Sequence, residues 1–480
     1  MQYRRVMAQG ASSGQLSSTK VVEPPVLTGA RMRLAAGTFL ASAAGFAGLV
    51  GLAPSASSSV SAPVWPVLVT NVSVNTVDVI GPTGTIALKV GTSPSGVAVT
   101  PDGKYAYVVD RGAKALSVIV GPGTSSPTVA ATTVPLGSKP VSIAITPDGN
   151  YAYVPNAFDN TVTVVGGVDT PTPTVLTTLH VGSQPIGVAI TPDGKYAYIA
   201  NAGADSLSVI DKAESATPTV SSTTLIVGTN PALPVVTPDG KYLYVATTAL
   251  NRIAVVDNAD SPNPSVSPTT LPVGSGPIGI AITPDGTYGY VANGVSNDVS
   301  VLVNVDSTNP SVAPTTLAMG TGNPDRVAIS PDGKMAYVGK SLSTSLKVIT
   351  GADTASPVVS MTSLTVGKGP LGIAVVPDQA PVAAFTVRAA VHGSATYLNA
   401  TTSTVAFGTI SSYAWSFGDG QVATTTTPRT SHIFVAPGSY SVTVTETDSA
   451  GTSIALAFTG QTVSHNGGPS ATVTHSVAIH

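Results

Sequence analysis

The 480-residue chain has no cysteine and only 9% charged residues. The lack of cysteine excludes disulfides, CxxCH haem attachment and thiolate zinc sites. Globular chains typically carry about 25% charged residues, so serine, threonine, asparagine and glycine must supply most of the solubility here. The net charge is −3 and there are no basic runs. Nucleic-acid binding is therefore excluded, since phosphates require clustered lysine and arginine.

Most of the chain is a repeat of nearly constant length. Pro-Asp-Gly begins at Pro101, Pro147, Pro192, Pro238, Pro284 and Pro331, and a degenerate copy follows at Pro377. Each unit holds four short runs rich in Val, Ile, Thr and Tyr and bounded by Gly, Pro, Asn and Asp, which is typical of strands. No long amphipathic helical spacing occurs in these units. Four strands per unit of about 40–45 residues predict a β-propeller blade.

Counting the strands predicts how the ring closes. The strand after the turn occurs seven times, beginning with a copy at Val67 that has no turn before it. The strand before the turn also occurs seven times, ending with a copy at Leu371. The last strand has no blade of its own unless it joins the first three. We predict an all-β fold, a seven-bladed β-propeller closed by a shared first blade, which leaves few open strand edges.

Two segments resemble known families. TPDGKYAYIAN (191–201) and TPDGTYGYVAN (283–293) resemble the YVTN propeller repeat of archaeal surface-layer and bacterial exported proteins. WSFGDG from Trp415 and PGSYSVTVTETD from Pro437 resemble a PKD domain, which implies a small immunoglobulin-like β-sandwich acting as a spacer or binding module. The predicted domains are a lead and signal or anchor at 1–62, the propeller at 63–378, the sandwich at 379–464 and a polar tail at 465–480.

The N-terminal region predicts export. Arg31 and Arg33 precede a charge-free apolar run at 34–53, and small-residue sites follow at Ala56 and Ala62. This is the layout of a secretory signal peptide. The run is also near the length that spans a bilayer, so an uncleaved anchor is the alternative. With the arginines inside, both versions place the repeats outside the cytoplasm, extracellular or at the cell surface. Met1 and Met32 are both candidate starts.

No motif of established chemistry is present. We find no paired nucleophile and base and no histidine pair at metal-ligand spacing, and we therefore expect no catalytic residue, no metal and no cofactor. The six aspartates of Pro-Asp-Gly are explained by their turns. Asp419 could bind calcium in the PKD-like segment, but a lone carboxylate is weak support.

One blade departs from the repeat. GTGNPDRVAIS places Asp325 and Arg326 at the start of an inner strand, after a loop with one extra residue. Arg326 could bind an anionic or sugar ligand at the axial funnel; the alternatives are an internal Asp-Arg pair or drift. Other binding candidates lie on loops predicted to share that face, where they could equally form a solvated rim. These are Arg111, Lys139, Phe158, Arg252 and Lys368.

The resemblances and the lack of a reactive constellation favour an exported, non-enzymatic scaffold. Its loop face would bind a protein or a cell-envelope glycan, with the PKD-like domain as spacer or tether. Membrane contact is expected only through the possible N-terminal anchor. The alternative is an enzyme of the lactonase or periplasmic dehydrogenase-subunit type, with its site in the axial funnel.

Overall fold

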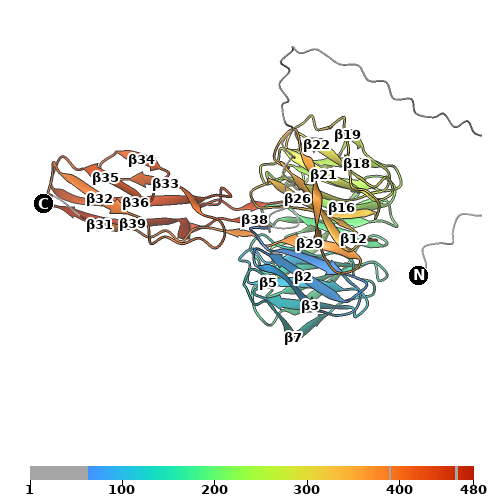
Figure 1. Cartoon of the computed structure of the whole chain (residues 1–480). Coiled ribbons are helices and arrows are strands. Elements are labelled where there is room, and N and C mark those ends of the chain that lie inside the picture. Colours follow the sequence, from blue (N-terminus) through green and yellow to red (C-terminus); the bar gives the residue numbers. More distant parts are fainter. Residues whose placement is uncertain (1–62, 389–390, 460–462) are drawn as a thin grey trace, which may run out of the picture. The chain divides into compact units, whose positions relative to one another are not determined.

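The computed structural model describes residues 63–388, 391–459 and 463–480 (Figure 1). The predicted signal or anchor segment and both candidate starts lie outside these residues. Among the described residues, no helix is long and apolar enough to cross a membrane.

Residues 67–375 form seven sheets of the kind predicted for blades. In order from inner to outer strand, blade 1 is β29 (Pro370–Val375), β1 (Val67–Asn71), β2 (Thr76–Gly81) and β3 (Gly84–Lys89). Blade 2 is β4 (Pro94–Val99), β5 (Tyr105–Asp110), β6 (Ala115–Val120) and β7 (Thr128–Pro135). Blade 3 is β8 (Ala144–Ile145), β9 (Tyr151–Asn156), β10 (Thr161–Gly166) and β11 (Thr174–His180). Blade 4 is β12 (Pro185–Ile190), β13 (Tyr196–Asn201), β14 (Ser206–Asp211) and β15 (Thr219–Ile226).

The remaining blades follow the same order. Blade 5 is β16 (Pro231–Val236), β17 (Tyr242–Thr247), β18 (Arg252–Asp257) and β19 (Ser265–Pro272). Blade 6 is β20 (Pro277–Ile282), β21 (Tyr288–Asn293), β22 (Asp298–Val303) and an outer strand in two pieces, β23 (Ser311–Val312) and β24 (Leu317–Ala318). Blade 7 is β25 (Pro324–Ile329), β26 (Met335–Lys340), β27 (Ser345–Thr350) and β28 (Val358–Thr365).

The inner strands form a closed ring. Contacts run from β29 to β4, β8, β12, β16, β20 and β25, and from β25 back to β29. Within blade 1, β29 pairs antiparallel with β1, so that Val375 lies opposite Val67. The predicted seven-bladed propeller with a shared first blade is confirmed.

Each Pro-Asp-Gly turn is held by its aspartate. The Asp102 Oδ1 accepts hydrogen bonds from Thr100 Oγ1 at 2.7 Å and from the Lys104 backbone N at 3.1 Å. Gly103 has a φ of 68°, which favours glycine. The same Oδ1 bonds recur at Asp148, Asp193, Asp239, Asp285 and Asp332. These carboxylates are therefore parts of turns.

Tyrosines of the second strands join neighbouring blades. The Tyr198 hydroxyl of blade 4 donates to the Ala259 carbonyl of blade 5 at 2.7 Å, and the ring is fully buried. Equivalent bonds join Tyr107 to Val168, Tyr153 to Ala213, Tyr244 to Val305 and Tyr290 to Ala352. Smaller aliphatic side chains fill the opposite face, as Ala197 and Ile199 do behind Tyr198, which lets large and small side chains interleave between sheets.

Antiparallel pairing sends the connections to two faces. The Pro-Asp-Gly turns and the Pro-rich loops from third to fourth strand share one face. The other face, called here the mouth face, carries two sets of loops. One set joins second to third strands, at 72–75, 111–114, 157–160, 202–205, 248–251, 294–297 and 341–344. The other leads from outer strands to the next inner strand, at 90–93, 136–143, 181–184, 227–230, 273–276, 319–323 and 366–369.

The C-terminal strands form the predicted second β-domain. One sheet contains β31 (Thr386–Arg388), β32 (Ala395–Asn399) and β35 (Arg429–Ile433). The other is ordered β34 (Val422–Thr425), β33 (Ile410–Ser416), β36 (Gly438–Asp448) and β39 (Thr472–Ile479). A small third sheet contains β30 (Asp378–Gln379), β38 (Val463–Asn466) and β37 (Ala457–Phe458). The buried Trp415 packs edge-on against Phe385 at the core.

The prediction of an unstructured polar tail at 465–480 is wrong. A short 3-10 helix, η1 (Pro469–Ala471), leads into β39, which pairs with β36 along its whole length. Val477 and Ile479 are buried in the core of the sandwich. The outward hydroxyls pair across the strands, as in the 2.7 Å contact between Thr443 Oγ1 and Thr474 Oγ1. The sandwich therefore extends to Ile479.

Candidate functional site at the axial mouth

The inner strands line a narrow axial cavity below the mouth face. Its lining comes from six blades and includes Gly96, Ser142, Leu233, Gly279, Arg326 and Gly372. The volume is about 40 Å³, which suits water and is far too small for a sugar. A ligand larger than water that binds on this axis would therefore have to sit at the opening of the cavity, on the mouth face.

One equivalent position in each blade forms a ring of residues around the opening. The second residue after the strand-leading proline is Gly96, Ser142, Gly187, Leu233, Gly279 and Gly372 in six blades, and Arg326 in blade 7. Most blades need glycine because a neighbouring backbone lies too close. A Cβ on Gly279 would stand 2.5 Å from the Asp325 carbonyl oxygen. Arg326 is thus the one long polar side chain in this ring.

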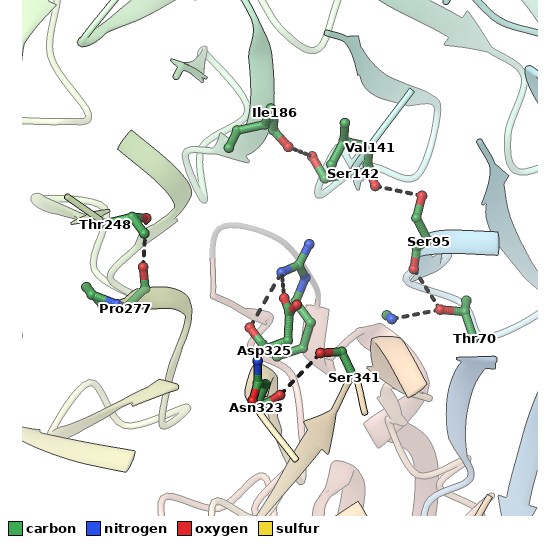
Figure 2. A network of polar contacts seen from close by, with 12 residues as sticks. Thr70, Ser95, Val141, Ser142, Ile186, Thr248, Pro277, Asn323, Asp325 and Ser341 are labelled. Carbon is green, nitrogen blue, oxygen red and sulfur yellow. Dashed lines mark hydrogen bonds and ion pairs between the residues drawn. The ribbon is translucent and has the colours of Figure 1, made fainter. Parts of the chain in front are cut away.

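Hydrogen bonds between blades surround the opening (Figure 2). The Ser142 hydroxyl donates to the Ile186 carbonyl at 2.9 Å, and the Ser95 hydroxyl donates to the Val141 carbonyl at 2.9 Å. Thr70 and Thr248 make similar bonds to Ser95 and Pro277. Asp325 lies inside the circle of these residues in Figure 2. The circle is a rigid frame on which a site can be built.

Asp325 and Arg326 form an ion pair at this opening. The Arg326 guanidinium donates to Asp325 Oδ1, and both side chains are mostly buried, with 15% and 18% exposed. Burial lowers the pKa of Arg326, and the positive charge of Arg111 lowers it further. Arg111 of blade 2 and Arg326 of blade 7 therefore influence each other electrostatically. The opening itself holds the carboxylate of Asp325 and the guanidinium of Arg326.

Lys340 supports the loop that carries this pair. It ends β26, where other blades have Asn71, Asn156 or Asn201. Its Nζ donates to the Thr321 carbonyl at 3.0 Å and to the Met319 carbonyl at 3.3 Å, and burial lowers its pKa. The sequence analysis did not single out Lys340 for a role, although it is a second departure in the blade that has the extra loop residue.

The other predicted binding residues make no contact with the Asp325–Arg326 pair among the contacts of the described residues. Lys139 Nζ stands 4.4 Å from the centre of the exposed Phe158 ring, a cation–π contact of two loops. Arg252 donates to Thr270 of an outer strand at 3.3 Å. Lys368 is exposed on the loop before β29. The structure thus joins Asp325 with Arg326 at the opening and Lys139 with Phe158 on two loops of the mouth face.

The PKD-like segment offers no comparable site. Asp419 Oδ2 lies 2.6 Å from His432 Nε2, and its Oδ1 accepts the Gln421 backbone N–H. Within the described residues, no group of three or more His, Cys, Asp or Glu could hold a metal ion.

The comparisons with known proteins decide the family. The model of the lactonase, 7-bladed beta-propeller family matches residues 97–262 and 236–389, which together are more than half of the chain. The chain belongs to this lactonase family. A PKD domain model matches residues 378–463. No curated protein matches the chain.

Solved structures agree on the fold of this lactonase-family propeller. A proposed 6-phosphogluconolactonase of Bacteroides uniformis is 19% identical, with 65% of this chain and 100% of that chain covered and a TM-score of 0.57. The periplasmic gluconolactonase of Pseudomonas aeruginosa is also 19% identical, with 65% and 99% covered and a TM-score of 0.55. A functionally unknown protein of Desulfotomaculum acetoxidans is 19% identical, with 65% of this chain and 98% of that chain covered and a TM-score of 0.56.

Membership of a lactonase family overturns one prediction of the sequence analysis. The expected non-enzymatic scaffold is wrong, because the family match indicates an enzyme. The expectation of no catalytic residue came from searching for known motifs. A pair made of adjacent residues in one divergent blade matches no such motif, and its setting becomes clear only in the closed ring.

Proposed function

We propose that this protein hydrolyses a lactone at the axial mouth. The proposal is supported by the family match and by one structural observation. Arg326 stands where the inner strands of the other blades bring glycine, serine or leucine to the same ring, and Asp325, the residue before it, forms its ion pair. An ion pair placed at the opening of a rigid frame suits catalysis better than it suits stability, since partly buried ion pairs stabilise a fold little.

The pair provides the two functions that lactone hydrolysis needs. Asp325 accepts a proton from the attacking water, while the Arg326 guanidinium stabilises the negative charge that develops on the carbonyl oxygen. The C–O bond of the ring then breaks, and the ring oxygen takes the proton back from the Asp325 carboxyl. The product is an open-chain hydroxy acid. Its carboxylate would leave past Arg326, whose charge favours an anion.

The surroundings favour a polar substrate. Hydroxyls and peptide carbonyls border the opening, and the cavity beneath admits only water. These groups are bonded to one another, but a sugar-derived lactone can still donate hydrogen bonds to the second lone pairs of their oxygens, which an apolar ring cannot do. We therefore infer an aldonolactone as the substrate class.

The test is hydrolysis of a lactone panel by the purified chain, followed as acid release with glucono-δ-lactone and an unsubstituted δ-lactone. Asp325→Asn and Arg326→Met should each lower kcat/KM by about 100-fold or more, because each removes a group acting in the transition state. Arg252→Met is the matched control on the same face and should keep full activity. Activity that survives both mouth substitutions would place the site elsewhere. No hydrolysis by the wild type would refute the proposal.

The cellular location and the partners of the protein are proposed from the sequence alone. A position outside the cytoplasm, as in YVTN-type exported proteins, rests on the layout of residues 31–62, which lie outside the described part of the chain. A protein or cell-envelope glycan partner stays a prediction. Protease protection of whole cells against lysed cells would test the location.

A further inference from the structure

Apolar side chains project from the mouth face in five of the seven blades. Phe158, Val295 and Leu342 are 68%, 72% and 76% exposed, and Val74 and Leu250 are also exposed. All five occupy the short loops from second to third strand. Single exposed apolar residues are ordinary, but the same loop exposing one in blades 1, 3, 5, 6 and 7 is a pattern.

Other loops of the same face carry positive charge. Loops of the mouth face contain Arg111, Lys114, Lys139 and Lys368. Within the described part of the chain, none of these four forms an ion pair. The ion pairs found there involve Lys104, Lys195, Lys241, Lys334, Arg326 and His432 instead.

The acidic groups of this face are turned into the loops. Asp159 Oδ2 accepts the Ser138 backbone N–H at 2.6 Å, and Asp205 Oδ1 accepts the Asn230 backbone N–H at 2.9 Å. These carboxylates fix loop conformation and are less available to a partner than the lysines are.

The opposite face has the reverse charge. Its loops carry five lysines against eleven acidic residues. The acidic residues are Asp102, Asp148, Asp169, Asp193, Glu214, Asp239, Asp260, Asp285, Asp306, Asp332 and Asp353. The propeller is therefore polarised, and a negatively charged surface would attract the mouth face and repel the other.

We propose that the mouth face docks on an anionic lipid surface, with the five apolar tips entering the interface. Separate tips, each only a few residues long and spaced around a ring, suit lipid, which fills the space between them. A protein partner needs a continuous packed core, which glycine, serine and asparagine between the tips do not supply. Basic side chains beside the tips contact the phosphate groups. The proposal does not depend on the lactonase reaction.

The test uses residues 57–480, which form one compact unit and lack the apolar run at 34–53. Flotation with phosphatidylcholine–phosphatidylglycerol vesicles is compared with phosphatidylcholine alone. We expect binding to the anionic vesicles that weakens in high salt. The triple variant Phe158→Ser, Val295→Ser, Leu342→Ser should bind at least about ten-fold more weakly, since interfacial affinity scales with the apolar area inserted. Lys114→Glu, Lys139→Glu, Lys368→Glu should lower binding similarly.

Matched controls keep the proposal falsifiable. Val358→Ser, Met361→Ser, Val422→Ser removes three equally exposed apolar residues elsewhere and should leave binding unchanged. Phe158→Trp should show blue-shifted emission on adding anionic vesicles, whereas Met361→Trp should not. Equal binding by the loop triple and the control triple overturns the proposal, as does absence of binding. Sedimentation showing a dimer that the loop triple dissolves would identify a second copy as the occupant and also overturn it.

Discussion

Trp65 and Asp378, 313 positions apart in the chain, are joined by a buried hydrogen bond of 2.7 Å from Nε1 to Oδ1. The other oxygen of Asp378 accepts from the Thr452 hydroxyl at 2.6 Å. One carboxylate thus connects the residues before β1, the residues after β29 and the second domain. Ring closure and attachment of the PKD domain depend on the same side chain.

This junction should respond to pH through Asp448. Burial and the neighbouring Asp378 carboxyl raise the pKa of Asp448. The folded protein therefore holds this proton after the unfolded chain has lost it, and stability falls as pH rises from about 4 towards the raised value. Asp448→Asn, neutral throughout, should remove this loss. Unfolding midpoints across pH, followed by tryptophan fluorescence, should diverge above pH 4, with the variant more stable. Parallel curves would contradict the assignment.

Asp110 should make a second pH-dependent contribution to the free energy of unfolding. Burial raises its pKa to about 6, and Ser117 Oγ donates to its Oδ2 at 2.6 Å. Other blades have asparagine here, as at Asn201, whose Nδ2 donates to Ser208 Oγ. Asp110→Asn should stabilise the protein at pH 7 by roughly 2–3 kcal/mol, at 1.36 kcal/mol for each pKa unit.

The pH profile distinguishes this explanation for Asp110 from better packing. The gain should grow as pH rises from about 4 through about 6 and then level off, because only the folded state keeps the proton in that window. Denaturant titrations at a series of pH values measure it. A gain that is constant from pH 4 to pH 8 would mean that the charge of Asp110 is not its cause.

The tyrosine bonds between blades should contribute measurably to stability. Tyr198→Phe leaves the Ala259 carbonyl without its buried donor and should cost about 1–2 kcal/mol. Tyr337 is the matched control, because its hydroxyl contacts only the Met335 sulfur at 3.7 Å. Tyr337→Phe should change the free energy of unfolding by less than about 0.5 kcal/mol, as for a weak contact. Equal losses at both positions would show that the bond to Ala259 adds nothing.

Lys340 should act on the reaction as a positioning residue. Lys340→Asn restores the residue of the other blades but removes both bonds to the loop at 319–323. Misplacing Asp325 and Arg326 by a fraction of an ångström should lower kcat about ten- to 100-fold with little change in KM. Steady-state kinetics measure the split, and circular dichroism confirms the fold. An unchanged kcat would show that the loop holds its shape without Lys340.

The repeat made the propeller predictable, because most blades share the same local pattern. That pattern is a Pro-Asp-Gly turn followed by a strand in which tyrosine alternates with small residues. The C-terminal strand β39 was missed because an edge strand needs few apolar residues. Only alternate positions such as Val473 and Val477 face inward, and threonines face out to match the threonines of β36. From amino-acid composition alone, the residues of β39 cannot be distinguished from a polar tail.

The site was predictable only in part. The extra residue before Asp325 pointed to blade 7, but the electrostatic influence of Arg111 of blade 2 on Arg326 depends on closing the ring, which no local pattern contains. The apolar tips on the mouth face were overlooked for a different reason. Val295 and Leu342 differ in residue type and in flanking sequence, so their common exposure appears only when the loops are placed in space.

Closing the ring with β29 has a mechanical consequence. Everything after Val375 pulls on an inner strand, so tension applied through the PKD domain is delivered to the pairing of β29 with β1. Force along that path loads the hydrogen bonds between β29 and β1. No tyrosine bond of the Tyr198 type joins blade 7 to blade 1 or blade 1 to blade 2 within the described chain. We therefore expect a stretched molecule to break first at the pairing of β29 with β1. The axial frame beside Gly372 and Arg326 should then come apart before the other blades unfold.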